Sequence, residues 1–435
     1  MVAFVSQRTA ADLRGTEIPV AERVRPLVDV LLAPDARVDI EFWDGSTITR
    51  GNSVGSLILR SSRAIRHIAW APGELGLARA FVSGDMDFSG DVIDMVTQLR
   101  SSSPRQNSLA RAVPGILRAA WDLKAIGPRP PIPATERVPG LWAAHSPGRD
   151  RAAISHHYDV SNEFYALVLG RSMTYSCAYF ADPSVELATA QQAKHELVCR
   201  KLGLGERPSM RLLDVGCGWG SMAMHAAAVH GAQVVGITIS REQAQHARHR
   251  VEAAGLSDLV EIRLQDYREL GGETFDAVSS VGMSEHVGKA KLSTYFSLLR
   301  ASLAPQGRLL NHAISSVGGS RLPRSGFIYR YVFPEGELID LGDTVRAMQD
   351  AGLEVRDVQS LREHYDHTLR HWVGNLEQNW AHAVALAGEE RARTWRLYMA
   401  ASAVGFADAG INVHQVLAVA NDAEGTSGMS MTRPV

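Results

Sequence analysis

Between residues 150 and 420 the chain alternates short apolar runs with longer stretches in which apolar residues recur about every three or four positions. Short apolar runs bounded by glycine or polar residues are typical of buried strands, and the longer period is typical of amphipathic helices. The predicted strands are Arg211–Val215, Gln233–Thr238, Val260–Leu264, Phe275–Ser280, Arg308–Ile314, Leu353–Val358 and Val413–Val419. The predicted helices between them are Ser221–Val229, Arg241–Ala254, Lys291–Leu303 and Thr344–Ala351. This alternation predicts an α/β fold with a Rossmann-like, mostly parallel, seven-stranded sheet.

The remaining segments have other patterns. Mostly helical insertions at 320–336 and 366–410 contain Trp372, Trp380, Trp395 and Phe406 and are expected to form a lid over a substrate. Residues 21–100 combine the predicted helices Ala21–Leu32 and Leu75–Val82 with strand-like pieces at Val38–Trp43 and Ser56–Leu59, which predicts a small α+β domain. The predicted organisation is a flexible terminus at 1–20, the α+β domain at 21–100, a basic linker at 101–149, the α/β domain with its helical lid at 150–420 and a disordered tail at 421–435.

Composition narrows the class of protein. A net charge of -2 over 435 residues argues against a general nucleic-acid binder. No apolar run approaches the ~20 residues that span a bilayer, and the first residues lack the pattern of a secretory signal, so we expect a cytoplasmic protein. The three cysteines, Cys177, Cys199 and Cys217, are an odd number without ligand-like spacing, so neither disulfides nor a metal site is expected.

The stretch 100–129 is strongly basic and has two interpretations. Its positive residues are Arg100, Arg105, Arg111, Arg118, Lys124 and Arg129, against the single acid Asp122. With interleaved apolar residues they would favour anionic lipid headgroups by about 1 kcal/mol each near a membrane surface. The alternative is a solvated linker helix that Pro114 and Gly115 interrupt.

The most informative motif is the run Arg211-Leu-Leu-Asp-Val-Gly-Cys-Gly-Trp-Gly220. Its glycines, Gly216, Gly218 and Gly220, let the backbone approach a ligand closely, and the following helix directs its N-terminal amides at that ligand. The spacing fits the dinucleotide motif G-x-G-x-x-G poorly. The pattern D-x-G-x-G-x-G is instead the usual first motif of S-adenosylmethionine-dependent methyltransferases, so Asp214 is interpreted as a residue that fixes the glycine turn beside the cofactor.

Later strand ends supply further cofactor candidates. Thr238, Ser240 and Gln243 follow the second strand, where many methyltransferases place an acid that holds the ribose. After the third strand come Gln265, Asp266 and Tyr267. Asp266 could accept from an adenine amino group and Tyr267 could stack on the base. The alternative is that these residues are strand-end caps and surface polar groups, and Cys217 and Trp219 are interpreted as packing residues.

Eight sequence blocks then occur in a fixed order. They are Ser155–Tyr165, Met173–Phe180, Ala190–Lys194, the glycine motif, Gly236–Ser240, Gln265–Arg268, Val281–Gly288 and Tyr331–Gly336. Together they strongly resemble the cyclopropane-fatty-acyl-phospholipid synthase family, to which the mycolic acid cyclopropane synthases are related. The resemblance covers about residues 150–420, and Ala71–Asp85 is similar to the family's smaller lipid-associated domain.

The resemblance implies a class I methyltransferase that transfers a methyl group from S-adenosylmethionine to a cis double bond of a membrane phospholipid acyl chain. It also implies a bound bicarbonate ion as the base that deprotonates the resulting carbocation. The residues that match the family's bicarbonate site are Cys177, Glu285, His312, Ile314 and Tyr365, and Tyr175 and Ser176 match its contacts to the methionine end of the cofactor. Taken singly, the cysteine, histidine and tyrosine also fit a buried filler, a satisfied core histidine and an anchor.

The chain departs from the commonest family pattern at Ser284, which replaces a bulky residue, and at Asn311. With Glu335–Leu338 and Leu361–Tyr365, these positions resemble a subgroup found beside a flavin-dependent reductase. That subgroup makes 10-methylene acyl chains on the way to tuberculostearic-type lipids. The expected product is therefore a methylene-branched chain, with a cyclopropane chain as the alternative from the same first step.

The resemblance also implies partners. They are the phospholipid at the inner face of the cell membrane, where the enzyme would associate peripherally, and a flavin-dependent reductase that acts on the product; a homodimer stays open. Two other functions remain as alternatives. A small-molecule O- or N-methyltransferase would explain the cofactor motifs but not the set around Glu285. A non-catalytic lipid-binding protein would not need the intact glycine motif.

Overall fold

The computed structural model describes residues 18–33, 35–101, 127–137, 161–319, 323–334 and 336–432, together with residues 114 and 121. Most of the predicted flexible terminus and basic linker, part of the block Ser155–Tyr165, and Glu335 lie outside these residues. The chain divides after Pro133 into two compact units, which are described separately. Of the helices in the described part, none combines the length and apolar character needed to cross a membrane.

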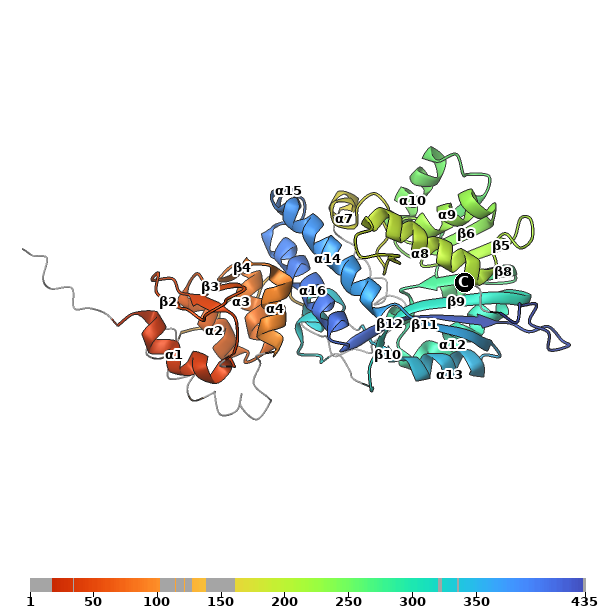
Figure 1. Ribbon diagram of the computed structural model, residues 1–435. Coiled ribbons are helices and arrows are strands. Elements are labelled where there is room, and N and C mark those ends of the chain that lie inside the picture. The colour runs from red at the N-terminus through yellow and green to blue at the C-terminus, as the bar shows by residue number, and fades with distance from the viewer. Residues whose placement is uncertain are drawn as a thin grey trace, which may run out of the picture. The chain divides into compact units, whose positions relative to one another are not determined.

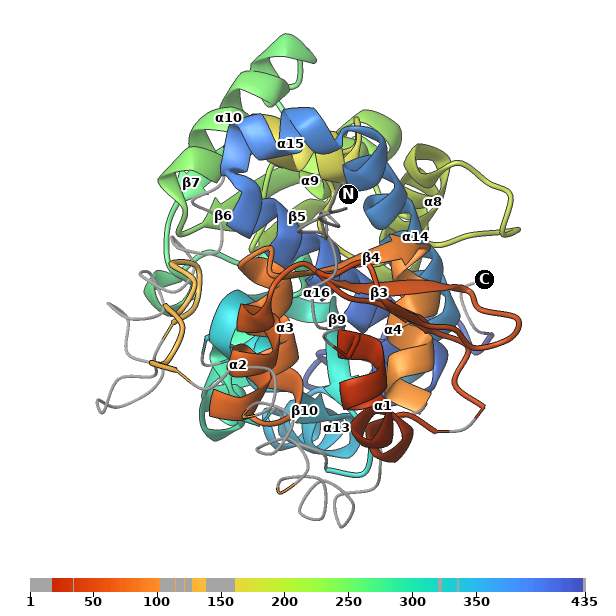
Figure 2. The same ribbon diagram turned by 90° about the vertical axis from the view of Figure 1, so that its left-hand side faces the viewer.

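The first unit is a small α+β domain, shown in Figure 2. Its elements are α1 (Val20–Leu31), β1 (Asp39–Glu41), β2 (Thr47–Ile48), β3 (Gly55–Leu59), α2 (Ser62–Trp70), α3 (Glu74–Val82), β4 (Met86–Gly90) and α4 (Val92–Ser101). The strands form a mixed sheet in the order β2-β1-β3-β4. Phe81 and Phe88 stack in its core with their ring centroids 4.9 Å apart, because both side chains are directed to the buried face.

The second unit is built around a large sheet (Figure 1). Its strands are β5 (Arg211–Val215), β6 (Gln233–Thr238), β7 (Val260–Leu264), β8 (Phe275–Val281), β9 (Leu303–Ser316), β10 (Ile339–Asp340), β11 (Glu354–Ser360) and β12 (Ile411–Val419). In the described part of the chain they follow the order β11-β12-β9-β8-β5-β6-β7, with the short β10 paired to β9. Neighbours are parallel except around β12, which is antiparallel to both β9 and β11. The predicted mostly parallel α/β sheet is confirmed.

Helices cover both faces of this sheet, as Figure 1 shows. They are α8 (Leu187–Leu202), α9 (Ser221–His230) and α10 (Arg241–Ala253) on one face, and α12 (Leu292–Ala301) and α13 (Leu341–Asp350) on the other. Successive strand residues point to opposite faces, so Leu212 packs in the first of these layers and its neighbour Leu213 in the second. Between β8 and α12 lie the short helix α11 (Ser284–Val287) and a 3-10 turn at Lys289–Lys291, and a second such turn, Tyr267–Glu269, follows β7.

The helical insertions are α14 (Arg362–Gln378), α15 (Trp380–Ala387) and α16 (Glu389–Ala407), with a short π-helix at Ile328–Val332. They pack on one another and on α7 (Asn162–Leu169). Trp372, Trp395 and Phe406 are buried in this layer, so the aromatic residues noted in the sequence form its interior.

The predicted disordered tail needs correction. Asn421 donates to Glu354 at 2.7 Å, and Asp422 accepts from the Gln306 side chain at 2.6 Å. Met429 packs against the core layer that covers one face of the sheet. The sequence did not predict these contacts, because residues 421–432 are mostly polar and hydrogen bonds to neighbouring strands produce no hydrophobic period.

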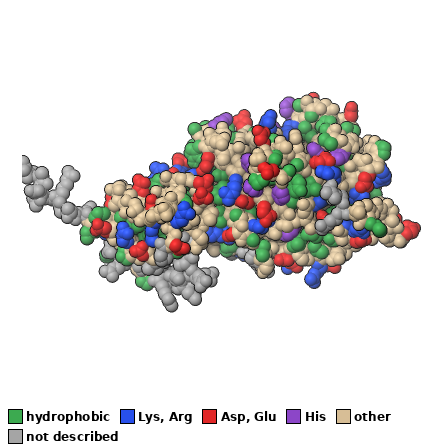
Figure 3. Space-filling view, viewed as in Figure 1, with side chains coloured by type: hydrophobic (Ala, Val, Ile, Leu, Met, Phe, Trp, Pro, Cys, Tyr) green, Lys and Arg blue, Asp and Glu red, His purple; other side chains and the backbone are tan. Residues whose placement is uncertain are grey.

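The surface carries both signs of charge. On the face in Figure 3, acidic and basic side chains of the described residues are interspersed over the second unit, in keeping with a net charge of -2 for the chain.

Candidate active site

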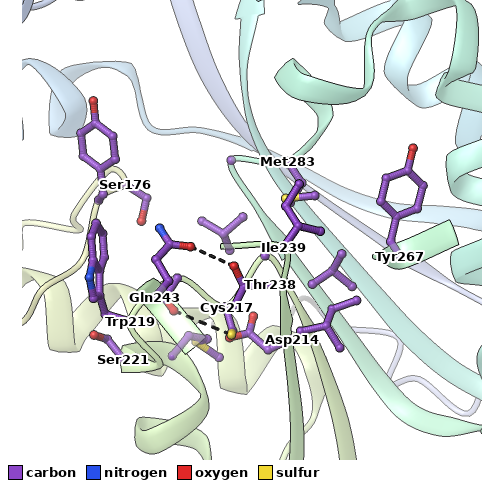
Figure 4. Close-up of a pocket in the computed structure, with 18 of the residues that line it drawn as sticks. Ser176, Asp214, Cys217, Trp219, Ser221, Thr238, Ile239, Gln243, Tyr267 and Met283 are labelled. Carbon is purple, nitrogen blue, oxygen red and sulfur yellow. Dashed lines mark hydrogen bonds between the residues drawn. The ribbon is translucent and has the colours of Figure 1, made fainter. Parts of the chain in front are cut away.

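A cavity opens at the carboxyl ends of β5, β6, β7 and β8, where a parallel sheet binds its ligand. Predicted cofactor residues that line it are Tyr175, Ser176, Asp214, Gly216, Gly218, Thr238, Gln243, Gln265, Asp266 and Tyr267. Cys217 and Trp219, interpreted from the sequence as packing residues, also line it. In Figure 4 Trp219 and Tyr267 lie on opposite sides of this cavity, with Asp214 between them at its floor.

Two predicted cofactor residues lie just behind the wall. Gly220 caps the start of α9 with a φ of 81°, and a Cβ there would come within 3.3 Å of Ala247. Ser240 caps the start of α10, where its hydroxyl accepts from the Gln243 amide at 3.2 Å. Both residues therefore shape the cavity through the helices that they cap.

The glycine turn explains how a ligand can approach. Gly216 has a φ of 75°, and a Cβ there would lie 2.4 Å from the sulfur of Met283. Gly218 has a φ of 55°, and nothing lies within 4 Å of where its Cβ would be. The backbone at Gly218 therefore borders open space, which a bound molecule can enter up to the main chain.

The floor of the cavity holds two buried ionisable groups. The Asp214 carboxylate accepts from Ser279 at 2.5 Å through one oxygen, while its other oxygen has no partner among the described residues. Burial raises the pKa of Asp214 to about 6. Lys194 is 1% exposed, donates to Ser176 at 3.0 Å and has its pKa lowered by burial to about 8. Lys194 was not among the predicted site residues, although a lysine amid apolar positions of a helix was a signal for it.

The rim of the cavity is preorganised by side-chain contacts. The Thr238 hydroxyl donates to the Gln243 amide oxygen at 2.9 Å (Figure 4). Asp266, predicted to accept from an adenine amino group, already binds Arg268, with its carboxylate oxygens 2.6 and 2.9 Å from the guanidinium nitrogens. The same guanidinium lies 5.3 Å from the centre of the Tyr267 ring. Arg268 therefore positions both of the groups expected at the adenine end.

Glu285 is the first of the predicted bicarbonate residues; it lies on α11 and is partly buried. Its Oε1 accepts from the Ile314 amide at 2.8 Å, and its Oε2 has no partner among the described residues. Burial raises the pKa of Glu285 to about 7, and the bond from Ile314 opposes this shift. The Ile314 amide, predicted to donate to the anion, thus holds the carboxylate of Glu285 instead.

His312 lies on β9 beside β12. Its Nδ1 is 3.2 Å from the Gln415 amide nitrogen, and its Nε2 has no partner among the described residues. Burial, assisted by the nearby charge of Lys194, lowers the pKa of His312 to about 3. The imidazole is therefore neutral at pH 7, and with Nδ1 accepting from the amide it presents an N–H from Nε2.

Cys177 and Tyr365 meet at the start of α14. The Cys177 sulfur lies 3.2 Å from the Ala178 carbonyl and 3.6 Å from the Leu361 carbonyl, which also accepts from the Tyr365 amide at 3.1 Å. Burial raises the pKa of the Cys177 thiol, so it stays protonated. The Tyr365 ring packs on Phe406 at 4.6 Å between centroids.

An aromatic wall joins the cofactor cavity to the helical insertions. The hydroxyls of Tyr175 and Tyr398 are 3.1 Å apart, and both rings contact Trp395. Tyr175 also contacts Trp372, at 5.4 Å between centroids. Burial raises the pKa of Tyr398 to about 12, and the charge of Glu285 adds to this shift, so the tyrosine stays neutral. The sulfonium end of the cavity is therefore bordered by an apolar, aromatic region, and Glu285 lies near enough for its charge to act on Tyr398.

This fold and cavity define a class I S-adenosylmethionine-dependent methyltransferase: a seven-strand path with one antiparallel strand, and an acid and three glycines after the first strand. Residues 145–416 match the family described as mycolic acid cyclopropane synthetase, and the chain belongs to this family. It is thus a fatty-acyl methyltransferase, as the sequence blocks indicated.

Three similar proteins illustrate the relationship. A probable fatty acid methyltransferase of Mycobacterium tuberculosis, Rv3720, is 42% identical over 89% of this chain and 92% of its own length. The tuberculostearic acid methyltransferase UfaA1 of the same organism is 37% identical over 65% of this chain and 68% of its own. The crystal structure of mycolic acid cyclopropane synthase CmaA1 complexed with SAH and CTAB superimposes with a TM-score of 0.58, at 34% identity over 62% of this chain and 98% of that one.

Proposed function

We propose that this enzyme methylates a cis double bond of an unsaturated acyl chain in a membrane phospholipid and so converts it to a methylene-branched acyl chain. The observation that carries the proposal is the Glu285 carboxylate, with one oxygen held by the Ile314 amide and the other, Oε2, buried and unpartnered among the described residues. Methyl transfer to an oxygen or nitrogen atom does not need such a carboxylate behind an aromatic wall. Methyl transfer to an alkene ends with loss of a proton from carbon, and the carboxylate can hold the base that removes this proton.

The chemistry accounts for the apolar surroundings. The π electrons of the alkene form a bond to the methyl carbon while the sulfur–carbon bond breaks and leaves its electron pair on sulfur. An alkene is a weak nucleophile, so holding it in line with the sulfonium must supply much of the rate. The neighbouring carbon becomes a cation that water would capture. Tyr175, Trp372 and Trp395 exclude water from this region, and their ring faces stabilise positive charge.

The side chains present fit a small anion with one hydroxyl, such as bicarbonate. Glu285 Oε2 can accept from that hydroxyl, and His312 Nε2 can donate to an oxygen; both atoms are buried and without a partner in the described part of the chain. Cys177 and the Ile314 amide are already engaged with protein acceptors, so the fit rests on the other residues of the predicted set. Bound there, bicarbonate would supply the base for the departing proton.

The proposed product depends on whether a hydride shifts before the proton leaves. A hydride shift followed by loss of a proton from the new methyl group gives an exocyclic methylene, whereas ring closure with loss of the same kind of proton gives a cyclopropane. Ser280 and Ser284 both donate to Asn311, at 3.3 and 3.4 Å, beside Glu285. This polar cluster replaces bulkier packing behind the carboxylate and can change its position relative to the cation. The similarity to the tuberculostearic acid methyltransferase supports the methylene product. A flavin-dependent reductase, which the resemblance to the subgroup implies, would consume that product.

The test uses vesicles of a dioleoyl phospholipid and S-adenosylmethionine carrying a ¹³C-methyl group. We expect the label to appear in the hydrolysed acyl chains as a terminal alkene carbon in the ¹³C NMR spectrum. A label found in a saturated three-membered ring would show that the product is a cyclopropane chain and not a methylene-branched one. Label transferred to small acceptors but never to lipid would overturn the proposed substrate class.

A further inference from the structure

Behind the wall of the cofactor cavity, α8 and α9 bring together side chains of the kinds that bind metals. One atom each of Cys199, His225 and His230 lies within 4.8 Å of the others. Glu196 adjoins this group on the histidine side, because its Oε2 is 3.3 Å from His225 Nε2 and 2.9 Å from His230 Nε2. The residues of this α8–α9 cluster have no place in the methyl-transfer chemistry.

The two helices explain why these four side chains converge. Glu196 and Cys199 are three positions apart on α8, so they share one face of that helix. His225 lies in the middle of α9 and His230 is its last residue, and α9 packs against α8. Cys199 is fully buried in the core, whereas the imidazoles are 15% and 13% exposed. The cluster therefore has a buried floor and an opening through which a small ion can enter.

We propose that Cys199, His225, His230 and Glu196 bind one Zn²⁺ ion. A thiolate, two imidazoles and a carboxylate are ligands that zinc takes in tetrahedral sites. With zinc–nitrogen bonds of about 2.0–2.1 Å and a zinc–sulfur bond of about 2.3 Å, the ligand atoms of a tetrahedron are roughly 3.3–3.7 Å apart. The histidine–glutamate separations of 2.9 and 3.3 Å are close to that spacing, and the 4.8 Å limit on the rest needs only small rotations of side chains.

The chemistry of the cluster also suits a metal. A coordinated thiol is deprotonated by the metal itself, so Cys199 would bind as a thiolate. Arg200 holds the second oxygen of Glu196 at 3.3 Å, as outer partners of metal ligands do.

The location gives the ion a structural role. His195, next to Glu196, lines the cofactor cavity, and its ring lies 5.6 Å from that of His225. The N-terminus of α9 directly follows the glycine turn. Zinc would therefore fix α8 against α9 behind the cofactor. Without a metal, Glu196 accepting from the two imidazole rings would make a hydrogen-bonded cluster, and the experiment separates the two states.

The test uses the full chain without a histidine tag, treated with chelator and then titrated with Zn²⁺ and with Co²⁺. We expect one Zn²⁺ per chain by calorimetry and elemental analysis. The cobalt form should show the strong visible bands of a tetrahedral site and a thiolate-to-cobalt charge-transfer band. His230→Gln and Cys199→Ala should each weaken binding by more than the roughly 10- to 100-fold that loss of an outer partner causes. His249→Gln, an exposed change on α10, is the matched control.

Two results would overturn the proposal. One is a folded wild-type chain, checked by circular dichroism, that binds no Zn²⁺. The other is bound metal whose stoichiometry survives His230→Gln and whose cobalt spectrum lacks the thiolate band. Neither readout depends on methyl transfer, so the zinc site and the proposed reaction can fail independently.

Discussion

At the scale of single residues, the site is marked by polar atoms that are buried and have no hydrogen-bond partner in the described part of the chain. Glu285, His312 and Asp214 each have one oxygen or nitrogen without a partner in the described part of the chain, while the opposite atom is fixed. Leaving such groups unpaired costs about 1–3 kcal/mol each, so folds keep them where a ligand or a reaction uses them. The sequence blocks located these residues, but only the structure shows which atom of each is free.

Replacing Glu285 by glutamine tests its role directly. Glu285→Gln keeps the shape and the bond from the Ile314 amide but removes the charge that orients the base. We expect turnover to fall by at least about 100-fold, in the range that loss of an acid–base group causes, while the Kd for S-adenosylmethionine changes little. Labelled methyl transfer and calorimetry measure the two. Glu252→Gln, an exposed change on α10, should leave both unaltered. A fully active Glu285→Gln enzyme would remove the residue from the mechanism.

The raised pKa of Glu285 also predicts a pH dependence of stability. The folded chain keeps a proton on Glu285 up to a pKa of about 7, whereas the unfolded chain releases it near 4.5. Because the folded state binds more protons in this window, its free energy of unfolding decreases as pH rises, by up to about 1.4 kcal/mol per pH unit from this group. Urea unfolding of wild type and Glu285→Gln from pH 4.5 to 7 should show the decrease in wild type in excess of the variant. Equal pH dependence of the unfolding free energy in the two proteins would contradict this prediction. The raised pKa of Asp214 contributes equally to both proteins, so it cancels in the comparison.

At the scale of elements, the strands of the large sheet were predicted well, whereas one helix, α8, was missed. The first four sheet strands begin and end within one residue of their predicted bounds, because each is a short apolar or alternating stretch between turns. Helix α8 was not predicted. It buries Gln191, Lys194, His195 and Lys201, so its inward face does not read as apolar. Those buried polar groups serve the cavity and the neighbouring strands, and tertiary contacts compensate for them.

Two lysines of α8 allow a matched comparison. Lys194 faces the cavity through Ser176, whereas Lys201, equally buried, binds Gln359 at 2.6 Å and lies 3.3 Å from Asp357. Lys194→Met should weaken S-adenosylmethionine binding by about tenfold or more, because the loss of one charge-assisted hydrogen bond costs about 1.5–3 kcal/mol. Lys201→Met should lower the melting temperature without that loss of affinity. Calorimetry and thermal unfolding give both quantities. Equal cofactor affinity in the two variants would show that Lys194 serves packing alone.

At the scale of the whole molecule, the chain is two compact units, and we propose that their roles divide in the same way. The second unit holds the cofactor cavity, Glu285 and the helical insertions. The first unit contains Ala71–Asp85, which resembles the family's lipid-associated domain, and the basic stretch 100–129. The proposed peripheral membrane association therefore rests on charge rather than on a membrane-spanning helix.

Charge neutralisation tests this association. Changing Arg105, Arg111 and Arg118 together to glutamine should weaken binding to anionic vesicles by about 3 kcal/mol, or roughly 100-fold, at about 1 kcal/mol for each charge. Co-sedimentation with vesicles measures the effect, and vesicles of neutral lipid should show little difference between the proteins. Unchanged binding to anionic vesicles would favour the solvated-linker interpretation of this stretch.

The sequence by itself determined the α/β class, the ligand end of the sheet and the family, because these depend on local periodicity and on motifs that lie close together along the chain. The tertiary structure alone decided that the Ile314 amide holds Glu285, that Lys194 lines the cavity and that Asn421, Asp422 and Met429 contact the sheet or its covering layer. It also brought the α8–α9 cluster together from two helices. Such pairings join residues far apart in sequence, and only the packed chain brings their atoms within hydrogen-bonding distance.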